Sequence, residues 1–201
     1  MLKGEKVILR AIERDDLKRL HELSHNVDLS TLAGGSWEPR SLAAVEKEFD
    51  KDLEDKDKHH FVIVVEEKVI GDIGLHHVDR LSNCTSFGIA ILEPEYLGKG
   101  YGRDALGVLV EYAFRLQNFR RMWLETHGNN ERAVRSYKAC GFVEEGRLRE
   151  HVFSDGAYID TLLMGLLRSE WEMRRMRNAA NATKSDLAGV GQQQIAFIAH
   201  D

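Results

Sequence analysis

The chain has 201 residues, 43% hydrophobic and 30% charged, and its 28 basic and 33 acidic side chains give a formal net charge of −5. This length and composition predict one globular domain with a substantial core, and the acidic balance without a long basic run argues against nucleic-acid binding. No apolar stretch approaches the roughly 20 residues that span a bilayer, no secretory signal is visible, and the two cysteines, Cys84 and Cys140, form no disulfide framework or metal-ligand pattern. We therefore expect a cytoplasmic protein with no membrane association and no metal site.

The first quarter of the chain predicts one strand and two helices. Residues 7–11 form an apolar run typical of a strand, and residues 13–23 place three leucines on one helical face. Ser41 is a suitable N-cap for the second helix. Residues 26–40, between the helices, are glycine-rich and loop-like. Trp37 in this loop is a candidate for shaping a substrate pocket, and packing onto the core is the simpler interpretation.

The middle of the chain predicts an antiparallel meander. Residues 61–65 and 69–78 are β-prone runs separated by a short charged turn, which is the pattern of a hairpin. Residues 85–92 predict the next strand. Pro94 cannot continue the hydrogen bonding of a central strand, so we expect the sheet to open just after this strand.

A glycine-rich loop at residues 97–103 leads directly into an amphipathic helix. Glycines at alternate positions of this loop free the backbone to turn sharply and to approach a ligand closely. The helix N-terminus presents unpaired N–H groups and a partial positive charge, to which Lys99 and Arg103 add formal charge, so the loop predicts a phosphate or pyrophosphate site. The apolar stripe of the helix consists of Ala105, Leu106, Leu109, Val110, Ala113 and Phe114.

The segment after this helix predicts a strand and a further helix. Residues 121–126 are strand-like, and a strand, a helical crossover and a second strand in one sheet should be parallel. Asn129 or Asn130 caps the next helix, which Gly141 ends.

The C-terminal part predicts two last strands and a tail. Residues 142–146 and 158–167 form the strands, joined by a glycine-containing turn. We expect residues 1–171 to form the folded domain and residues 172–201 to form a charged helical end and a small, polar tail. The apolar patch Ile195–Ala199 in this tail is a candidate contact in a homodimer.

The glycine loop also matches a different kind of site. Residues 100–105 fit a dinucleotide-binding fingerprint, with Glu125 near the position of its acidic partner. That fingerprint should close the first strand of a βαβ series, whereas several antiparallel strands precede it here. A dinucleotide-dependent enzyme therefore stays as an alternative. The P-loop pattern is absent, because its glycine and its Ser or Thr are missing.

A second motif follows the glycine loop and reads Asn130-x-x-Ala133-x-x-x-Tyr137-x-x-x-Gly141-Phe142. Together with the alternating glycines it resembles the GNAT family of N-acetyltransferases, most closely the branch of ribosomal-protein-alanine and polyamine N-acetyltransferases. The resemblance extends over about residues 7–171. It implies an α/β (α+β) fold: a mixed, mostly antiparallel sheet of six to seven strands, flanked by about four helices and split around a cofactor cleft.

The resemblance implies transfer of an acetyl group from acetyl-CoA, as co-substrate, to a primary amine of a small molecule or a protein N-terminus by direct attack. The cofactor would lie between the strands that end at Leu92 and Thr126. Leu97 departs from the Arg or Gln that often opens the family's loop, so backbone N–H groups must do more of the binding. The residues expected to bind the cofactor are Ile91, Leu92, Leu97, Gly98, Lys99, Gly100, Gly102, Arg103, Asn130 and Tyr137.

The resemblance also implies catalytic roles. Tyr137 is the general acid that protonates the departing thiolate. Glu93 is our candidate for the general base, and a water chain is an alternative. Adjacent histidines on a strand point to opposite faces, so at most one of His76 and His77 faces the cleft. The further candidate bases by residue type are Glu125, His76, His77 and His127.

The acetyl acceptor is the least determined part of the hypothesis. Trp37, His76 and Asp160 are candidate acceptor contacts, and Asp160 would attract a cationic amine. Two alternatives share the cofactor site: a non-catalytic acyl-CoA sensor, and an enzyme that transfers a longer acyl chain. The residues do not choose between a small-molecule amine and a peptide N-terminus.

Overall fold

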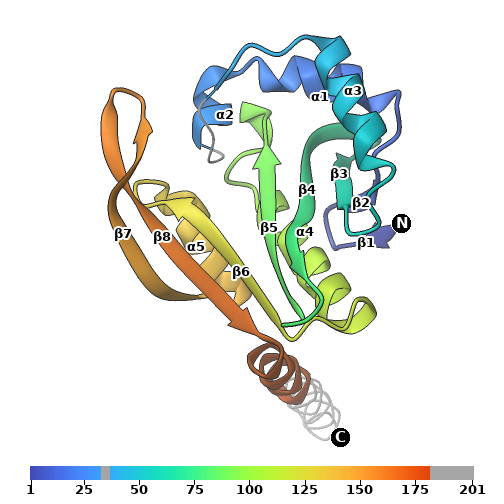
Figure 1. Cartoon of the computed structure of the whole chain (residues 1–201). Coiled ribbons are helices and arrows are strands. Elements are labelled where there is room, and N and C mark those ends of the chain that lie inside the picture. Colours follow the sequence, from blue (N-terminus) through green and yellow to red (C-terminus); the bar gives the residue numbers. More distant parts are fainter. Residues whose placement is uncertain (33–36, 182–201) are drawn as a thin grey trace, which may run out of the picture.

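The computed structural model describes residues 1–32 and 37–181, which form one mixed sheet with helices on both faces (Figure 1). The described sheet has eight strands in the order β1-β2-β3-β4-β5-β6-β8-β7. All neighbouring strands are antiparallel except β5 and β6, which are parallel as predicted. The sheet exceeds the expected six to seven strands because the two-residue strand β1 extends one edge. The predicted homodimer contact at Ile195–Ala199 lies outside the described residues.

The N-terminal part supplies the first five strands and three helices. The strands are β1 (Leu2–Lys3), β2 (Ile8–Ala11), β3 (His59–Val65), β4 (Lys68–Asp79) and β5 (Cys84–Ile91). The helices are α1 (Asp16–Ser24), α2 (Val27–Leu32) and α3 (Leu42–Asp52). Ser41 caps α3 as predicted, since its hydroxyl accepts a hydrogen bond from the backbone N–H of Ala44 at 3.2 Å.

The C-terminal part supplies the helices beside the glycine loop and the last three strands. These elements are η1 (Pro94–Tyr96), α4 (Tyr101–Glu111), its π-helical continuation η2 (Tyr112–Leu116), β6 (Arg121–His127), α5 (Glu131–Cys140), β7 (Val143–Ser154) and β8 (Ala157–Leu167). A further helix begins at residue 168 and continues to the end of the described chain. None of the described helices is long and apolar enough to cross a membrane.

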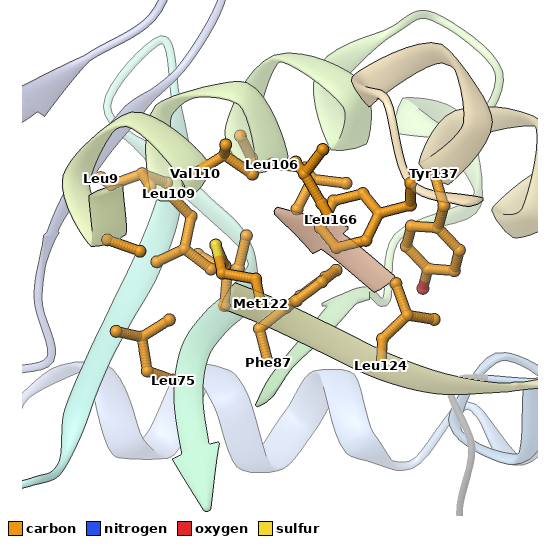
Figure 2. Close-up of a cluster of buried hydrophobic side chains, with 14 of the residues drawn as sticks. Leu9, Leu75, Phe87, Leu106, Leu109, Val110, Met122, Leu124, Tyr137 and Leu166 are labelled. Carbon is orange, nitrogen blue, oxygen red and sulfur yellow. The ribbon is translucent and has the colours of Figure 1, made fainter. Parts of the chain in front are cut away.

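The main core lies between the sheet and α4. All six residues of the predicted apolar stripe of this helix are buried, and they pack on buried side chains of β2 to β6 and β8 (Figure 2). A smaller cluster on the opposite face of the sheet contains Val62, Val64 and Val69, against which Leu20 of α1 packs. Two helical layers therefore cover the strands on either side.

Two elements differ from the sequence prediction. Residues 26–40 were expected to be a loop, but they contain α2, which Asn26 caps by accepting a hydrogen bond from the N–H of Leu29 at 3.1 Å. Six residues are too few to show a helical period. The strand expected at residues 142–146 continues to Ser154, because β7 is exposed along almost its whole length and so has no alternation of apolar residues.

The strands β5 and β6 diverge after a short parallel pairing (Figure 1). They pair only from Cys84 to Ser86 and from Arg121 to Trp123. Beyond Ser86, β5 remains paired with β4, and β6 remains paired with β8. The sheet is thus split at the place where the resemblance implied a cofactor cleft.

Candidate active site

A cavity of about 540 Å³ opens at the divergence of β5 and β6. Its lining comes from α2, β5, η1, the glycine loop, the first turns of α4, the end of β6 and one face of α5. Nine of the ten predicted cofactor residues line it: Ile91, Leu97, Gly98, Lys99, Gly100, Gly102, Arg103, Asn130 and Tyr137. The tenth, Leu92, is buried and donates its backbone N–H to the carbonyl of Ile70 at 3.1 Å.

The glycine loop places a helix N-terminus at this cavity. Gly98 and Gly100 have φ values of +73° and +90°, in the left-handed region where a side chain is strained. Gly100 is the N-cap of α4, and its carbonyl accepts the first helical hydrogen bond, from the N–H of Asp104 at 3.0 Å. The N–H groups that precede Asp104 in the helix have no intrahelical acceptor, as at any helix start, so they are available to an anion.

Tyr137 is held at the other side of the cavity by α5. Asn130 caps this helix by accepting from the N–H of Ala133 at 3.1 Å, and Gly141 ends it with a φ of +106°. The ring of Tyr137 packs edge-on against Phe87, with the ring centroids 5.8 Å apart (Figure 2). Both predicted boundaries of the motif are therefore confirmed.

The electrostatic surroundings of Tyr137 keep its hydroxyl neutral. Burial raises the pKa of this phenol to about 12, and a hydrogen bond with Thr126 partly opposes the rise. The tyrosine therefore carries its proton throughout the neutral and mildly basic range. A neutral phenol in a cavity is a proton donor, which is the state that a general acid requires.

Besides Leu92 and His76, three of the predicted site residues are not part of the cavity lining. The carboxylate of Glu93 is held by Arg19 and Lys68, so it is engaged in two ion pairs and does not line the cavity. The indole N–H of Trp37 donates to the carbonyl of Ser24 at 3.0 Å. The third residue, Asp160, is held by partners on the neighbouring strand β7.

Asp160 of β8 is committed to neighbouring β7. Its carboxylate pairs with Arg147 at 3.0 Å and accepts from the backbone N–H of Glu150 at 3.0 Å. The hydrogen bond from the Glu150 backbone, and after it the contact with Arg147, lowers the pKa of Asp160. Asp160 is not in the lining, so the structure does not bring it together with the other predicted residues.

His76 is not itself a lining residue, but it lies against Gly88, which is. Its Nε2 lies 3.1 Å from the position that a Cβ on Gly88 would occupy, and Gly88 lines the cavity. His60 stands beside it, with ring centroids 6.1 Å apart, and His60 Nε2 lies 2.8 Å from the carboxylate of Asp72. Partial burial, followed by the charge of His60, lowers the pKa of His76. His76 is therefore mostly neutral near pH 7.

The other candidate histidines are placed differently. His77 is exposed, has a φ of +46° and contacts Ser86 Oγ through Nδ1 at 2.9 Å. His127 is buried, which lowers its pKa, and it is not a lining residue. Of the adjacent pair, His76 lies against the lining residue Gly88, and His77 stands at an irregularity of the β4–β5 register.

Comparison with known proteins identifies the family. The model of the acetyltransferase (GNAT) domain matches residues 6–143. This chain is a member of the GNAT family. The expected fold, donor and class of reaction are thereby confirmed: the protein is a GNAT acetyltransferase, and its acyl donor is acetyl-CoA. The dinucleotide-dependent and sensor alternatives are not favoured.

Individual relatives are consistent with this family. Spermidine N(1)-acetyltransferase of Vibrio cholerae is 33% identical over 172 residues, which cover 84% of this chain and 96% of the relative. The putative ribosomal N-acetyltransferase YdaF of Bacillus subtilis is 27% identical over 178 residues, covering 84% and 95%. A crystal structure of the Vibrio cholerae spermidine N-acetyltransferase in complex with CoA and spermine superposes with a TM-score of 0.77, at 31% identity, and covers 84% of this chain and 99% of that one.

The cavity between β5 and β6 is also lined by residues that were not predicted from the sequence. Leu29 and Leu32 enter it from α2, the helix that was not predicted. The side-chain amide of Asn130 donates to the carbonyl of Leu32 at 3.0 Å, so it joins α2 to α5. Arg132 and Arg135 of α5 also line the cavity. The two arginines are three positions apart on the helix that Asn130 caps, so they lie on one face of it, and this spacing could have predicted them.

Proposed function

We propose that this enzyme transfers the acetyl group to a primary amine of a small aliphatic polyamine, with Tyr137 as general acid and His76 as general base. The observation that carries the proposal is the neutral, buried Tyr137 in a cavity whose opposite end is a glycine-rich helix N-terminus. The relatives named for spermidine support the class of acceptor.

The donor fits the cavity from one end to the other. We place the pyrophosphate of CoA at the glycine loop, where Lys99 and Arg103 add positive charge to the free N–H groups of α4. The pantetheine arm then follows β5, whose edge near Ile91 has lost β6 as a partner. An extended chain with amide groups can pair with such an edge, as a peptide does when it adds to a sheet. The thioester then lies near Tyr137.

The reaction is a direct displacement. The lone pair of a neutral amine attacks the thioester carbonyl carbon and forms the C–N bond, and the C–S bond breaks. The phenolic proton of Tyr137 moves to the sulfur, and the nitrogen, which becomes positively charged as the C–N bond forms, loses a proton to His76. The products are the N-acetylated amine and the free thiol of CoA, and solvent returns the proton from His76 to the tyrosine.

His76 replaces Glu93 as the proposed base for two reasons. Glu93 is already engaged in ion pairs with Arg19 and Lys68, whereas His76 has no ion pair among those of the described residues. His76 stands over Gly88 at the cavity wall, and its lowered pKa keeps it in the form that accepts a proton. Asp72, whose carboxylate contacts His60 Nε2, is the acidic group near His76 that opposes the fall of its pKa.

The base is tested by the pH dependence of kcat. The groups facing His76 are Lys58, His60 and His77, which lower its pKa, and Asp72, which raises it. Because the net shift is downward, kcat should fall as the pH drops through a value below 6.5, where the imidazole gains its proton. In His76→Gln this acid limb should disappear and kcat should fall at least about 10²-fold at neutral pH.

The neighbouring histidine is the matched control for this measurement. His77→Gln removes an exposed imidazole from the same strand. It should keep the acid limb and the kcat at its plateau, and it should move the limb slightly upward, because the charge of His77 is one of the causes that lower the pKa of His76. The ionisation of the amine contributes equally to all three profiles, so their difference isolates the side chain. A His76→Gln profile that differs from wild type no more than that of His77→Gln would assign the base elsewhere.

The acceptor is tested by thiol release with a panel of amines. Glu125 is exposed and lines the cavity, and Leu29 and Leu32 supply an apolar wall, which suits an aliphatic chain with a second positive charge. Spermidine and spermine should be consumed faster than a monoamine of similar length or a peptide N-terminus. Glu125→Gln should raise KM for spermidine about threefold, the scale of an exposed ion pair, and leave the monoamine unaffected. A preference for the peptide would refute the polyamine proposal.

A further inference from the structure

A lysine from the N-terminal turn lies against the glycine loop from the side away from α5. Lys6 stands between β1 and β2, and its Nζ donates a hydrogen bond to the carbonyl oxygen of Lys99 at 2.9 Å. The same Nζ lies 3.4 Å from the position that a Cβ on Gly100 would occupy. An exposed ammonium group from a distant part of the sequence is therefore fixed at the loop.

Asp104 holds the turn that carries this lysine. Its carboxylate, in the first turn of α4, accepts hydrogen bonds from the backbone N–H groups of Glu5 at 3.2 Å, Lys6 at 2.7 Å and Val7 at 3.0 Å. A Cβ added to Gly4 would collide with this carboxylate, so the close approach requires glycine there. The backbone of Lys6 is thus bound directly to the helix whose N-terminus faces the cavity.

A second cavity, of about 530 Å³, lies on this side of the loop. It shares Gly100 and Arg103 with the first cavity, so the two cavities adjoin at these residues. Its cationic side chains are Lys3, Lys6 and Arg103. Its acidic side chains are Glu5, Asp104, whose carboxylate accepts three backbone N–H hydrogen bonds, and Glu111, which pairs with Arg115. The positive charge is therefore local to the glycine loop, where Lys6 Nζ and Arg103 Nη2 lie 3.4 and 3.9 Å from the Cβ position of Gly100.

We infer that Lys6 is a coenzyme-binding residue whose ammonium group contacts a phosphate of CoA at the glycine loop, and that Asp104 is the residue that positions it. CoA carries a pyrophosphate and a 3′-phosphate, and both present anionic oxygens that a lysine binds as a point charge. The inference rests on the proposed position of CoA at the loop. Lys6 lies outside both the glycine loop at residues 97–103 and the motif at residues 130–142.

Equilibrium binding to the full-length Lys6→Ala variant tests the inference. The dissociation constants of CoA, dephospho-CoA and pantetheine are measured by calorimetry for wild type and variant. The variant should bind CoA about tenfold more weakly, the scale of one charge-assisted hydrogen bond. Lys6→Arg keeps the charge and should stay within about twofold of wild type. Lys18→Ala, which removes an exposed lysine of α1 that lines neither cavity, is the control and should have no effect.

The three ligands separate the outcomes. Weaker binding of CoA alone assigns Lys6 to the 3′-phosphate, and weaker binding of both CoA and dephospho-CoA assigns it to the pyrophosphate. Unchanged affinity for both, or an equal loss for pantetheine, overturns the inference. Failure of the wild-type protein to bind CoA would refute the proposed position of CoA instead.

A double-mutant cycle tests the positioning role of Asp104. Asp104→Asn should weaken CoA binding in the wild-type background and should add nothing in the Lys6→Ala background, because it acts through the lysine. Independent, additive effects would refute the positioning role. If Asp104→Asn does not fold, Gly4→Ala, which crowds the same carboxylate, takes its place in the cycle.

Discussion

Replacing Tyr137 by phenylalanine should lower kcat by about 10²- to 10⁴-fold, the usual contribution of a general acid. The substitution keeps the ring that packs against Phe87 and Phe142 and removes only the hydroxyl. The affinity for CoA should therefore change by less than about twofold, since the acid acts on the sulfur only as the C–S bond breaks. Steady-state kinetics with the preferred amine, together with calorimetry for CoA, separates the two effects.

The pH profile gives a second check on Tyr137. Because burial raises its pKa to about 12, the phenol stays protonated as the pH rises through the neutral and mildly basic range. Wild-type kcat should therefore show no basic limb from this group in that range. Tyr112→Phe is the matched control, because its hydroxyl, 2.8 Å from His59 Nδ1, lies outside the cavity. An unchanged kcat in Tyr137→Phe would remove the acid role.

The glycine loop and the α5 motif were predictable because their physical requirements are local. Gly100 and Gly141 adopt left-handed backbone angles that other residues rarely accept, so each position is marked by its residue type. Asn130 is an N-cap, and its preference is likewise a property of a few neighbouring residues. The spacing of these positions along one helix then places Tyr137 on the buried side.

The general base and the residues that contact the acetyl acceptor were less predictable, because their availability depends on partners that are distant in the sequence. Glu93 is a plausible base by residue type and position, but its carboxylate forms ion pairs with Arg19 and Lys68. These partners are distant in the sequence, so no local sequence pattern predicts the pairs. Asp160 is similarly taken by Arg147 from the neighbouring strand. A carboxylate can act as a base only when no neighbouring cation or N–H group already binds it. The sequence alone does not show which groups are neighbours in space.

The contact between Lys6 and the glycine loop shows the same limit. Lys6 and Asp104 are 98 positions apart, and their contact depends on β2 lying beside α4. Asp104 alone suggests an ordinary acidic residue in the first turn of a helix, where it complements the helix dipole. In the structure, Asp104 accepts hydrogen bonds from three backbone N–H groups of the N-terminal turn and so holds that turn against α4. This role depends on the assembled sheet and is not visible in the sequence.

Replacing Gly100 by glutamate should abolish CoA binding, with the dissociation constant raised at least about 100-fold. The new side chain would occupy a backbone position with a φ of +90°, at a cost of about 1–2 kcal/mol. Its carboxylate would lie where the phosphates are proposed to bind and would be close enough to pair with Lys6, whose Nζ is 3.4 Å from the Cβ position. Bulk, negative charge and loss of a cation therefore act in the same direction. Calorimetric titration with CoA measures the effect.

Gly156→Glu is the control for backbone strain and added charge. Gly156 has a φ of +80° and open space around it, and it lies in the turn between β7 and β8, away from the cavity lining. Both variants should lose a similar free energy of unfolding, because both force a side chain into the left-handed region. Only Gly100→Glu should lose CoA affinity, and Gly100→Ala should lose part of it, since it adds strain without charge. Equal CoA affinity in the two glutamate variants would mean that the phosphates of CoA bind elsewhere than at the glycine loop.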